Sequence, residues 1–352
     1  MPDSVDDLTE PARRGRVVAL GASAGGVEAL TRVVRELPAT FAAPVLVVLH
    51  VPSTAVSRLP EILRRAGGLP AEHPEHGAVP QPGRIYVAPP DRHMILSDGR
   101  LLLVEGPHEN GVRPAIDPLF RSVAAWYRGR TLAAVLSGTL DDGTAGIATV
   151  RAKGGVTAAQ DPAEAMAPGM PMSAIENVGV DYVLPAAELA ELFRRFVAGE
   201  VRPTSHDELR ASATSRASDL VCPECGGVLR QFHEQGLIRF HCRVGHTYSP
   251  DALYAAQDGR LEAALWAAIR SLEESASLAR RLAASARDRG SATTARKYEE
   301  REREAAERAD VVRSALLALS PLDETPPAGE PPPLAAEDEA RDPEAVGSRR
   351  SG

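Results

Sequence analysis

Three polar side chains with the chemistry of a serine hydrolase each follow a separate apolar run of this sequence. Ser23 lies in the motif GASAGG (21–26), His50 ends the run PVLVVLH, and Asp142 lies in SGTLDDGTAG. A serine hydroxyl becomes an effective nucleophile when a base takes its proton, and neutral histidine can do this near pH 7. A carboxylate beside the histidine fixes its tautomer and stabilises the imidazolium. These residue types predict a Ser23–His50–Asp142 triad, if the fold brings them together.

The backbone around the serine is suited to the same chemistry. Glycines beside Ser23 leave N–H groups open at the start of a helix, where negative charge is stabilised. We expect the backbone N–H groups of Ala24 and Thr139 to hold the oxyanion of a tetrahedral intermediate. The acid has two candidates, because Asp141 immediately precedes Asp142.

Other interpretations of these segments remain open from the residues alone. The motif at 21–26 is a near miss to the dinucleotide fingerprint GxGxxG, but Ser23 occupies the middle glycine position, where the backbone must approach a pyrophosphate. Ser23 can equally cap the following helix. His50 can be a solvated side chain, and Asp-Asp-Gly is a common turn or helix cap. The joint placement of all three at strand ends favours the catalytic interpretation.

The elements that must position these residues alternate between strand-like and helix-like segments. Apolar, β-branched runs that suit buried parallel strands lie at 17–22, 44–50, 84–89, 131–137, 155–160 and 181–185. Helical patterns lie at 27–37, 55–66, 116–129, 144–153 and 187–198. Asp98-Gly99 predicts a hairpin turn within 92–105. The fold class predicted is α/β, with a doubly wound, mainly parallel sheet whose carboxyl strand ends form the site.

All three cysteines of the chain lie in a short segment with metal-ligand spacing. Cys222 and Cys225 form a CxxC knuckle, and Cys242 and His246 follow as CxxxH. This pattern fits a closed tetrahedral Cys₃His zinc site, which predicts a structural zinc ion rather than a catalytic one. His241 is an alternative fourth ligand. We prefer His246, because Gly245 permits a turn and adjacent residues rarely both aim at one metal.

Composition divides the chain into further segments. We expect a disordered lead (1–15), an α/β domain (16–200), a polar linker (201–218) and a small zinc-ribbon-like unit (219–250). A helical hairpin (251–320) and a disordered tail rich in proline and acidic residues (321–352) complete the predicted order. The hairpin can be a packing element, or it can pair with a receptor's helices or with a second copy of the chain.

Charge and hydropathy narrow the function classes. The chain has 40 Lys+Arg and 48 Asp+Glu, a net charge of −8, which argues against a nucleic-acid binder. Its apolar runs are shorter than the ~20 residues of a membrane helix, and its first residues do not resemble a signal peptide. So few cysteines suit a reducing compartment. We therefore expect a cytoplasmic protein without membrane insertion.

Seven segments of the chain resemble, in order and at similar spacing, the chemotaxis receptor methylesterases with a CheB-type catalytic domain. They are VVALGASAGGVEAL, VLVVLHVP, YVAPPDRHM, RPAIDPLFRSVA, VLSGTLDDGTAGI, GGVTAAQDP and PGMPMSAI, and the resemblance covers about 16–200. It implies hydrolysis of glutamyl methyl esters on helical receptors, deamidation of receptor glutamine as a second reaction, and no cofactor for catalysis. It places the nucleophile on Ser23, the histidine on His50 and the acid on Asp142, because the family's acid immediately precedes the glycine matching Gly143.

Two further expectations follow from the resemblance. Many relatives carry a receiver domain before the esterase, whereas only about 15 residues precede the first strand here, so we expect no control through an attached receiver. Cys/His tails followed by helices accompany some members of the family. The alternative function is a non-catalytic signalling adaptor that combines an α/β domain with a zinc-binding tail, and a nucleotide-binding protein ranks third.

Overall fold

The computed structural model describes residues 15–204 and 214–319, within two compact units, Met1–Leu261 and Glu262–Gly352. The predicted tail (321–352) and all but the last residue of the predicted lead (1–15) lie outside the described residues.

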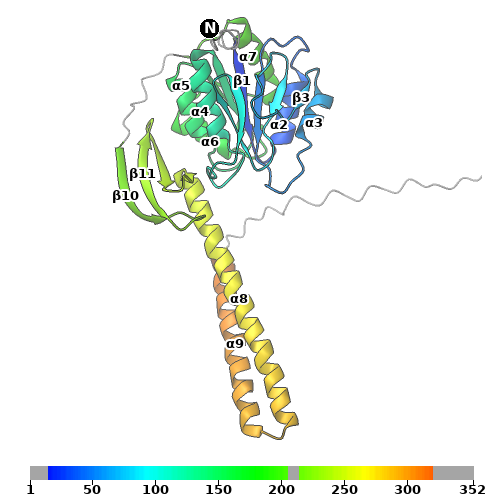
Figure 1. Ribbon diagram of the computed structural model, residues 1–352, viewed down its shortest axis with the longest axis vertical. Helices are drawn as coiled ribbons and strands as arrows, with labels where there is room; N and C mark the ends of the chain where they lie inside the picture. The colour runs from blue at the N-terminus through cyan, green and yellow to red at the C-terminus, as the bar shows by residue number, and fades with distance from the viewer. Residues whose placement is uncertain (1–14, 205–213, 320–352) are drawn as a thin grey trace, which may run out of the picture. The chain divides into compact units, whose positions relative to one another are not determined.

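A seven-stranded sheet forms the centre of the first unit, with the order β3-β4-β2-β1-β7-β8-β9 (Figure 1). Every neighbouring pair in it is parallel, so the predicted α/β class with a mainly parallel sheet is confirmed. The strands are β1 (Val17–Ala22), β2 (Val45–Leu49), β3 (Ala71–Glu72), β4 (Ile85–Val87), β7 (Thr131–Val135), β8 (Val156–Gln160) and β9 (Tyr182–Leu184).

Helices cover both faces of this sheet, because its strands are apolar on both sides. In β1, Val18 and Leu20 belong to one buried cluster and Val17 and Ala19 to the other, as the two-residue alternation of a strand requires. The first cluster includes α2 (Gly26–Arg35), α3 (Leu59–Ala66) and α7 (Ala186–Ala198). The second includes α4 (Ile116–Tyr127), α5 (Thr144–Ala152) and α6 (Gly169–Asn177).

The order of the strands defines where a site can form. The chain runs from β1 outward to β2 on one side and later returns to place β7 on the other side of β1. Such a switch in direction opens a crevice at the carboxyl ends of the flanking strands, where α/β proteins bind their ligands. The segments that follow β1, β2 and β7 therefore meet at one edge.

Some elements differ from the sequence expectation. The two-residue strand β3 and helix α6 were not expected. Pro168 and Pro171 flank the start of α6, so its sequence lacks an ordinary helical pattern. Helix α3 begins at Leu59 rather than at residue 55. The hairpin between β5 (His93–Ser97) and β6 (Arg100–Val104) turns at Asp98-Gly99 as expected, with both residues at positive φ.

A four-stranded antiparallel sheet follows, which we call the Cys/His unit (214–249). Its strands are β10 (Thr214–Val221), β11 (Val228–Glu234), β12 (Leu237–Cys242) and β13 (Thr247–Tyr248). β10 begins inside the segment predicted as linker (201–218), so that linker is shorter than expected. The unit has a small buried cluster that includes Leu229, Phe240 and Tyr248.

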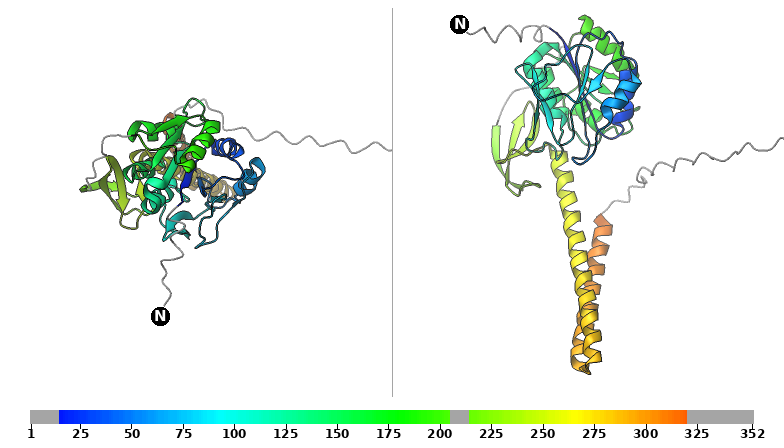
Figure 2. Two further views of the ribbon diagram at one scale, coloured as in Figure 1. Left: turned by 90° about the horizontal axis from the view of Figure 1, so that it is seen from above. Right: turned by 45° about the vertical axis from the view of Figure 1, so that its right-hand side comes forward.

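Two long helices end the described chain, α8 (Pro250–Asp288) and α9 (Ala292–Leu319), with a break at residues 289–291. In the second unit, α8 and α9 run side by side (Figure 2), and Arg280–Glu302 is one of the ion pairs between them. The seam is mostly alanine, with Ala283 and Ala309 both buried. Among the residues placed by the structure, no helix combines the length and hydropathy needed to cross a lipid bilayer.

Candidate active site

Ser23 lies in the turn that connects β1 to α2, at the edge defined above. The turn bends at Gly25, whose φ of 72° favours glycine. The Ser23 N–H donates to the carbonyl of Ser137, which follows β7, at 2.8 Å. The next residue, Gly138, has no room for a side chain, because a Cβ there would lie 2.8 Å from Ser23 Cβ. The serine is thus held tightly between the ends of β1 and β7.

His50 reaches the same edge through the register of β1 and β2. Ala22 pairs with Leu49, and the His50 N–H donates to the Ala22 carbonyl at 3.1 Å. Ser23 and His50 are therefore the next residues along two neighbouring parallel strands. In the described chain no hydrogen bond joins Ser23 Oγ to His50, a contact that commonly tightens only when substrate binds.

His50 contacts the carboxylate of Asp142. His50 Nε2 lies 2.7 Å from Asp142 Oδ2, with the two side chains 14% and 3% exposed. With Nε2 bonded to the carboxylate, Nδ1 is the ring nitrogen left to accept a proton. The structure thus joins the predicted histidine to Asp142.

The N-terminus of α4 surrounds the Asp142 carboxylate with hydrogen-bond donors. The Ile116 N–H lies 2.7 Å from Oδ2, and the Asn110 side-chain amide donates to Oδ1 at 2.9 Å. Gly21 lets α4 approach this closely, because a Cβ there would lie 2.4 Å from the Ile116 side chain. Burial alone would raise the pKa of Asp142, but the hydrogen bonds from His50, Ile116 and Asn110 lower it to about 2. The aspartate is held as a carboxylate.

Comparison with known proteins matches this region to one family. Residues 18–193 match the model of the CheB methylesterase family, which spans half of the chain. The chain belongs to the CheB methylesterase family. Residues 18–193 are called the methylesterase domain below.

The relatives found by sequence and by structure agree. A protein-glutamate methylesterase/protein-glutamine glutaminase of Anaeromyxobacter dehalogenans is 38% identical over 186 residues, which are 52% of this chain and 54% of that protein. One from Thermotoga maritima is 36% identical over 188 residues, 52% and 55% of the two chains. The crystal structure of the T. maritima CheB methylesterase catalytic domain matches with 35% identity and a TM-score of 0.50, covering 52% of this chain and 99% of that one. The chain spans about half the length of the curated relatives it matches.

Asp141, the competing acid, also lies in the methylesterase domain, but its partner comes from outside that domain. Its Oδ1 accepts a hydrogen bond from Ser249 Oγ at 2.7 Å, at the end of the Cys/His unit. Burial raises the pKa of Asp141 to about 6, and the Ser249 hydroxyl only partly offsets this effect. The residue that faces His50 is Asp142.

Hydrogen bonds hold the two loops that carry the predicted oxyanion donors, at Ala24 and Thr139. The Ala24 carbonyl accepts from Ser137 Oγ at 2.6 Å, which fixes the peptide after Ala24. Before Thr139, Gly138 is fixed at both ends, because its N–H donates to Ala167 and its carbonyl accepts from Met170. These hydrogen bonds hold the two loops in place; the oxyanion role of Ala24 and Thr139 stays a prediction.

A pocket opens beside the histidine. Its wall comes from the segment after β2 and from the loop before α4, and its lining residues are His50, Val51, Pro52, Ser53, His108, Gly111, Val112 and Arg113. Arg113 is fixed in this wall by Asp91, whose Oδ1 lies 2.5 Å from Arg113 Nη2. The pocket thus leaves one side of His50 accessible.

Sequence reasoning missed several residues that shape the site. Asn110 and the N-terminus of α4 hold Asp142, and Arg239 pairs with Asp117 beside it. Nothing in the pattern of β12 distinguishes Arg239 from an exposed arginine. Asp117 lies in the segment RPAIDPLFRSVA, one of the seven that resemble the family. That resemblance is the signal that could have marked Asp117 as part of the site.

The four predicted metal ligands form a cluster in the Cys/His unit. Cys222, Cys225, Cys242 and His246 each offer a ligand atom within 4.8 Å of the others. Cys225 Sγ lies 3.6 Å from Cys242 Sγ, and Cys242 Sγ lies 3.5 Å from His246 Nδ1. Four such ligands around zinc would stand about 3.5–3.8 Å apart, given Zn–S and Zn–N distances of ~2.3 and ~2.0 Å. The residues therefore fit a tetrahedral metal ion.

The other ring nitrogen of His246 supports this assignment. His246 Nε2 lies 3.0 Å from Glu224 Oε2, so a carboxylate orients the imidazole, as at many metal sites. His241, the alternative ligand, lies outside the cluster, and its Nε2 lies 3.5 Å from Glu234.

Proposed function

We propose that this chain is a protein-glutamate methylesterase that hydrolyses glutamyl methyl esters with Ser23, His50 and Asp142. The observation that carries the proposal is the buried 2.7 Å contact of His50 with Asp142, one strand away from Ser23, at the switch point of the sheet. A helix cap or a solvated histidine would not need this pairing. The sequence relatives named as methylesterases support the same reaction.

The geometry suits an acyl-enzyme mechanism. Ser23 Oγ attacks the ester carbonyl carbon while His50 Nδ1 takes its proton, and the Ala24 and Thr139 N–H groups hold the oxyanion. Collapse of the intermediate breaks the bond to methoxide, which receives the proton from His50 and leaves as methanol. Water then attacks the acyl-enzyme, His50 again transfers the proton, and glutamate and free Ser23 result. Asp142 stabilises the imidazolium in both steps.

The substrate proposed is a methylated glutamate on a helical, chemoreceptor-like protein in the cytoplasm. The open pocket beside His50 can admit a side chain from a protein surface. An amide can enter the same mechanism with ammonia as the leaving group, so deamidation of receptor glutamine is the second proposed reaction. The helical hairpin (251–320) is proposed to contact such a receptor or a second copy of this chain.

The decisive experiment measures methanol release from a methylated receptor fragment. We expect release by the native chain, loss of release in Ser23→Ala, and full release in the matched control Ser275→Ala, whose exposed serine lies in α8. No release, and no hydrolysis of an activated ester by the folded native chain, would contradict the proposal and favour a non-catalytic adaptor.

The Cys/His unit is proposed to bind one structural zinc ion through Cys222, Cys225, Cys242 and His246. All four positions are occupied by protein ligands, so the metal would stabilise the fold and take no part in ester hydrolysis. Metal analysis of the purified chain should give near one equivalent of zinc, and Cys225→Ser should lose it. Purified, folded protein without metal would contradict this site.

A further inference from the structure

The loop before α4 is joined to the Cys/His unit by backbone pairing. The Asn110 N–H donates to the Thr247 carbonyl at 2.7 Å, and the Thr247 N–H donates to the His108 carbonyl at 3.3 Å. Glu109 and Thr247 form a parallel bridge. β13 thereby extends along the loop that carries Asn110.

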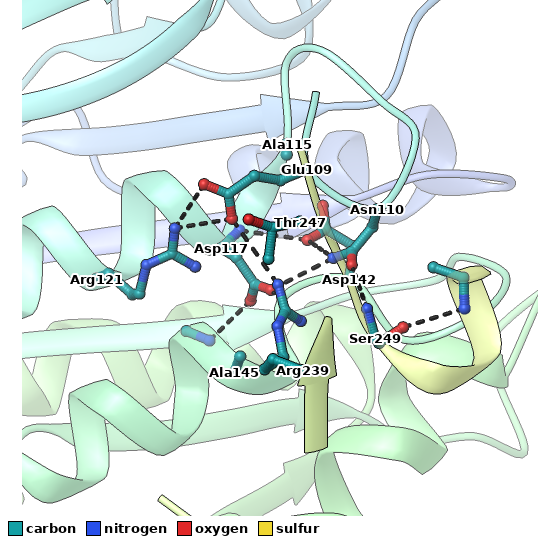
Figure 3. A network of polar contacts seen from close by, with 12 residues as sticks. Glu109, Asn110, Ala115, Asp117, Arg121, Asp142, Ala145, Arg239, Thr247 and Ser249 are labelled. Atoms are coloured by element: carbon teal, nitrogen blue, oxygen red, sulfur yellow. Dashed lines mark hydrogen bonds and ion pairs between the residues drawn. The ribbon is translucent and has the colours of Figure 1, made fainter. Parts of the chain in front are cut away.

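The Asn110 side chain connects this pairing to the triad (Figure 3). Its Oδ1 accepts from the Ser249 N–H at 3.0 Å, and its Nδ2 donates to Asp142 Oδ1 at 2.9 Å. The residue is 9% exposed. A side-chain amide accepts through its oxygen and donates through its nitrogen, so asparagine matches the backbone N–H on one side and the carboxylate on the other.

A second contact reaches the same place from β12. Arg239 Nη1 lies 3.1 Å from Asp117 Oδ2, with side chains 4% and 0% exposed. Asp117 Oδ1 accepts from the N–H groups of Gly143, the residue after Asp142, and of Gly146 in the first turn of α5. Figure 3 shows Arg239 of the Cys/His unit beside Asp117, and Ser249 of the same unit beside Asn110. Arg239 and Ser249 both lie beyond residue 193, where the family match ends.

We propose that Asn110 is a positioning residue for Asp142 and that the Cys/His unit holds it in place. The unit then completes the active site of this chain from outside the family domain. Asn110 acts through Asp142. It fixes the carboxylate that orients His50, and displacement of such a group by about 1 Å can lower a rate about a hundredfold. The kinetic part of the test rests on the proposed methylesterase function, and the spectroscopic part does not.

The test compares Asn110→Gly with Gln235→Gly in the full chain. Both residues have left-handed backbone, with φ of 53° and 51°, which glycine adopts freely. Both replacements remove an amide, and Gln235 also contacts the methylesterase domain, through Thr149 Oγ1 at 3.2 Å. Of these two residues, Asn110 contacts Asp142 and Gln235 does not. Comparing the two variants therefore separates the positioning of Asp142 from a general loss of contacts between the Cys/His unit and the methylesterase domain.

The first measurement is the downfield proton NMR resonance of the His50 N–H bonded to Asp142, identified by its absence in His50→Ala. We expect it in the native chain and in Gln235→Gly, and expect it to shift or vanish in Asn110→Gly. The second measurement is ester hydrolysis. We expect Asn110→Gly to lower kcat about a hundredfold, with KM within about twofold.

A second pair of variants tests the part played by the Cys/His unit. Ser249→Pro removes both the hydroxyl and the N–H that donates to Asn110, whereas Ser249→Ala removes the hydroxyl alone. We expect Ser249→Pro to reproduce the spectral change of Asn110→Gly, and Ser249→Ala to have a smaller effect. Equal effects of the two variants would show that the Ser249 N–H does not hold Asn110.

The outcomes separate the two proposals. The inference is overturned if Asn110→Gly leaves the resonance and kcat unchanged, if Gln235→Gly has an equal effect, or if the native chain lacks the resonance. A native chain with the resonance and no hydrolysis of any ester refutes the proposed function alone. The resonance in Asn110→Gly then decides the inference by itself.

Discussion

Asp117 and Asp142 cap each other's helices. Asp142, which precedes α5, accepts the Ile116 and Asp117 N–H groups at the start of α4. Asp117, in the first turn of α4, accepts the Gly143 and Gly146 N–H groups at the start of α5. Each carboxylate binds free N–H groups at the positive end of the other's helix. The exchange fixes the carboxylate that faces His50.

The triad assignment predicts a large effect of a nearly isosteric change at Asp142. Asp142→Asn keeps the oxygen that can accept from Ile116 but removes the charge that stabilises the imidazolium. We expect kcat for ester hydrolysis to fall about 10⁴-fold, as in other serine hydrolases. Asp141→Asn is the matched control, and an equal loss there would contradict the assignment.

The close packing around Ser23 predicts that a single methyl group at Gly138 disturbs catalysis. A Cβ at Gly138 would lie 2.1 Å from Met170 Sδ and 2.8 Å from Ser23 Cβ. We expect Gly138→Ala to displace Ser23 and lower kcat at least about a hundredfold. Gly259→Ala in α8 meets no atom within 4 Å and should keep full activity. Full activity in Gly138→Ala would show that Ser23 tolerates displacement.

The buried ion pair predicts strong coupling between β12 and α4. Arg239→Met leaves the fully buried Asp117 without its cation, and we expect the free energy of unfolding to fall by about 3–5 kcal/mol. The double variant Arg239→Met, Asp117→Asn should recover part of this loss, because position 117 then carries no charge that needs a cation. Chemical denaturation measures both. Equal stability of the single and double variants would contradict the coupling.

Asp141 predicts a specific dependence of stability on pH. Its pKa is raised from 3.8 to about 6 by burial, and the charged groups that face it are Asp117, Arg239 and Asp251. Between these pH values the folded chain keeps a proton that the unfolded chain has lost. This residue's contribution to stability therefore falls as pH rises from about 4 to about 6 and then stays constant.

The corresponding variant removes that dependence. The difference in free energy of unfolding, Asp141→Asn minus native, should be about 1–3 kcal/mol larger at pH 8 than at pH 4. Denaturation curves at both pH values check this. A difference between native and variant chains that does not change with pH would show that Asp141 titrates normally.

The sequence alone was enough to predict six of the seven strands of the parallel sheet, the positions of Ser23, His50 and Asp142 after three of them, and the four clustered metal-ligand residues. It did not predict β3 or the separate strands of the Cys/His unit. Strand polarity and CxxC spacing are local patterns, so they can be read along the chain. The contacts of Asn110, Asp117, Arg239 and Ser249 were decided only by tertiary structure. They depend on how β12 and the residue after β13 meet α4 and the loop before it, more than a hundred residues away in the chain. A buried arginine or asparagine needs a polar partner, and its local sequence does not show which one.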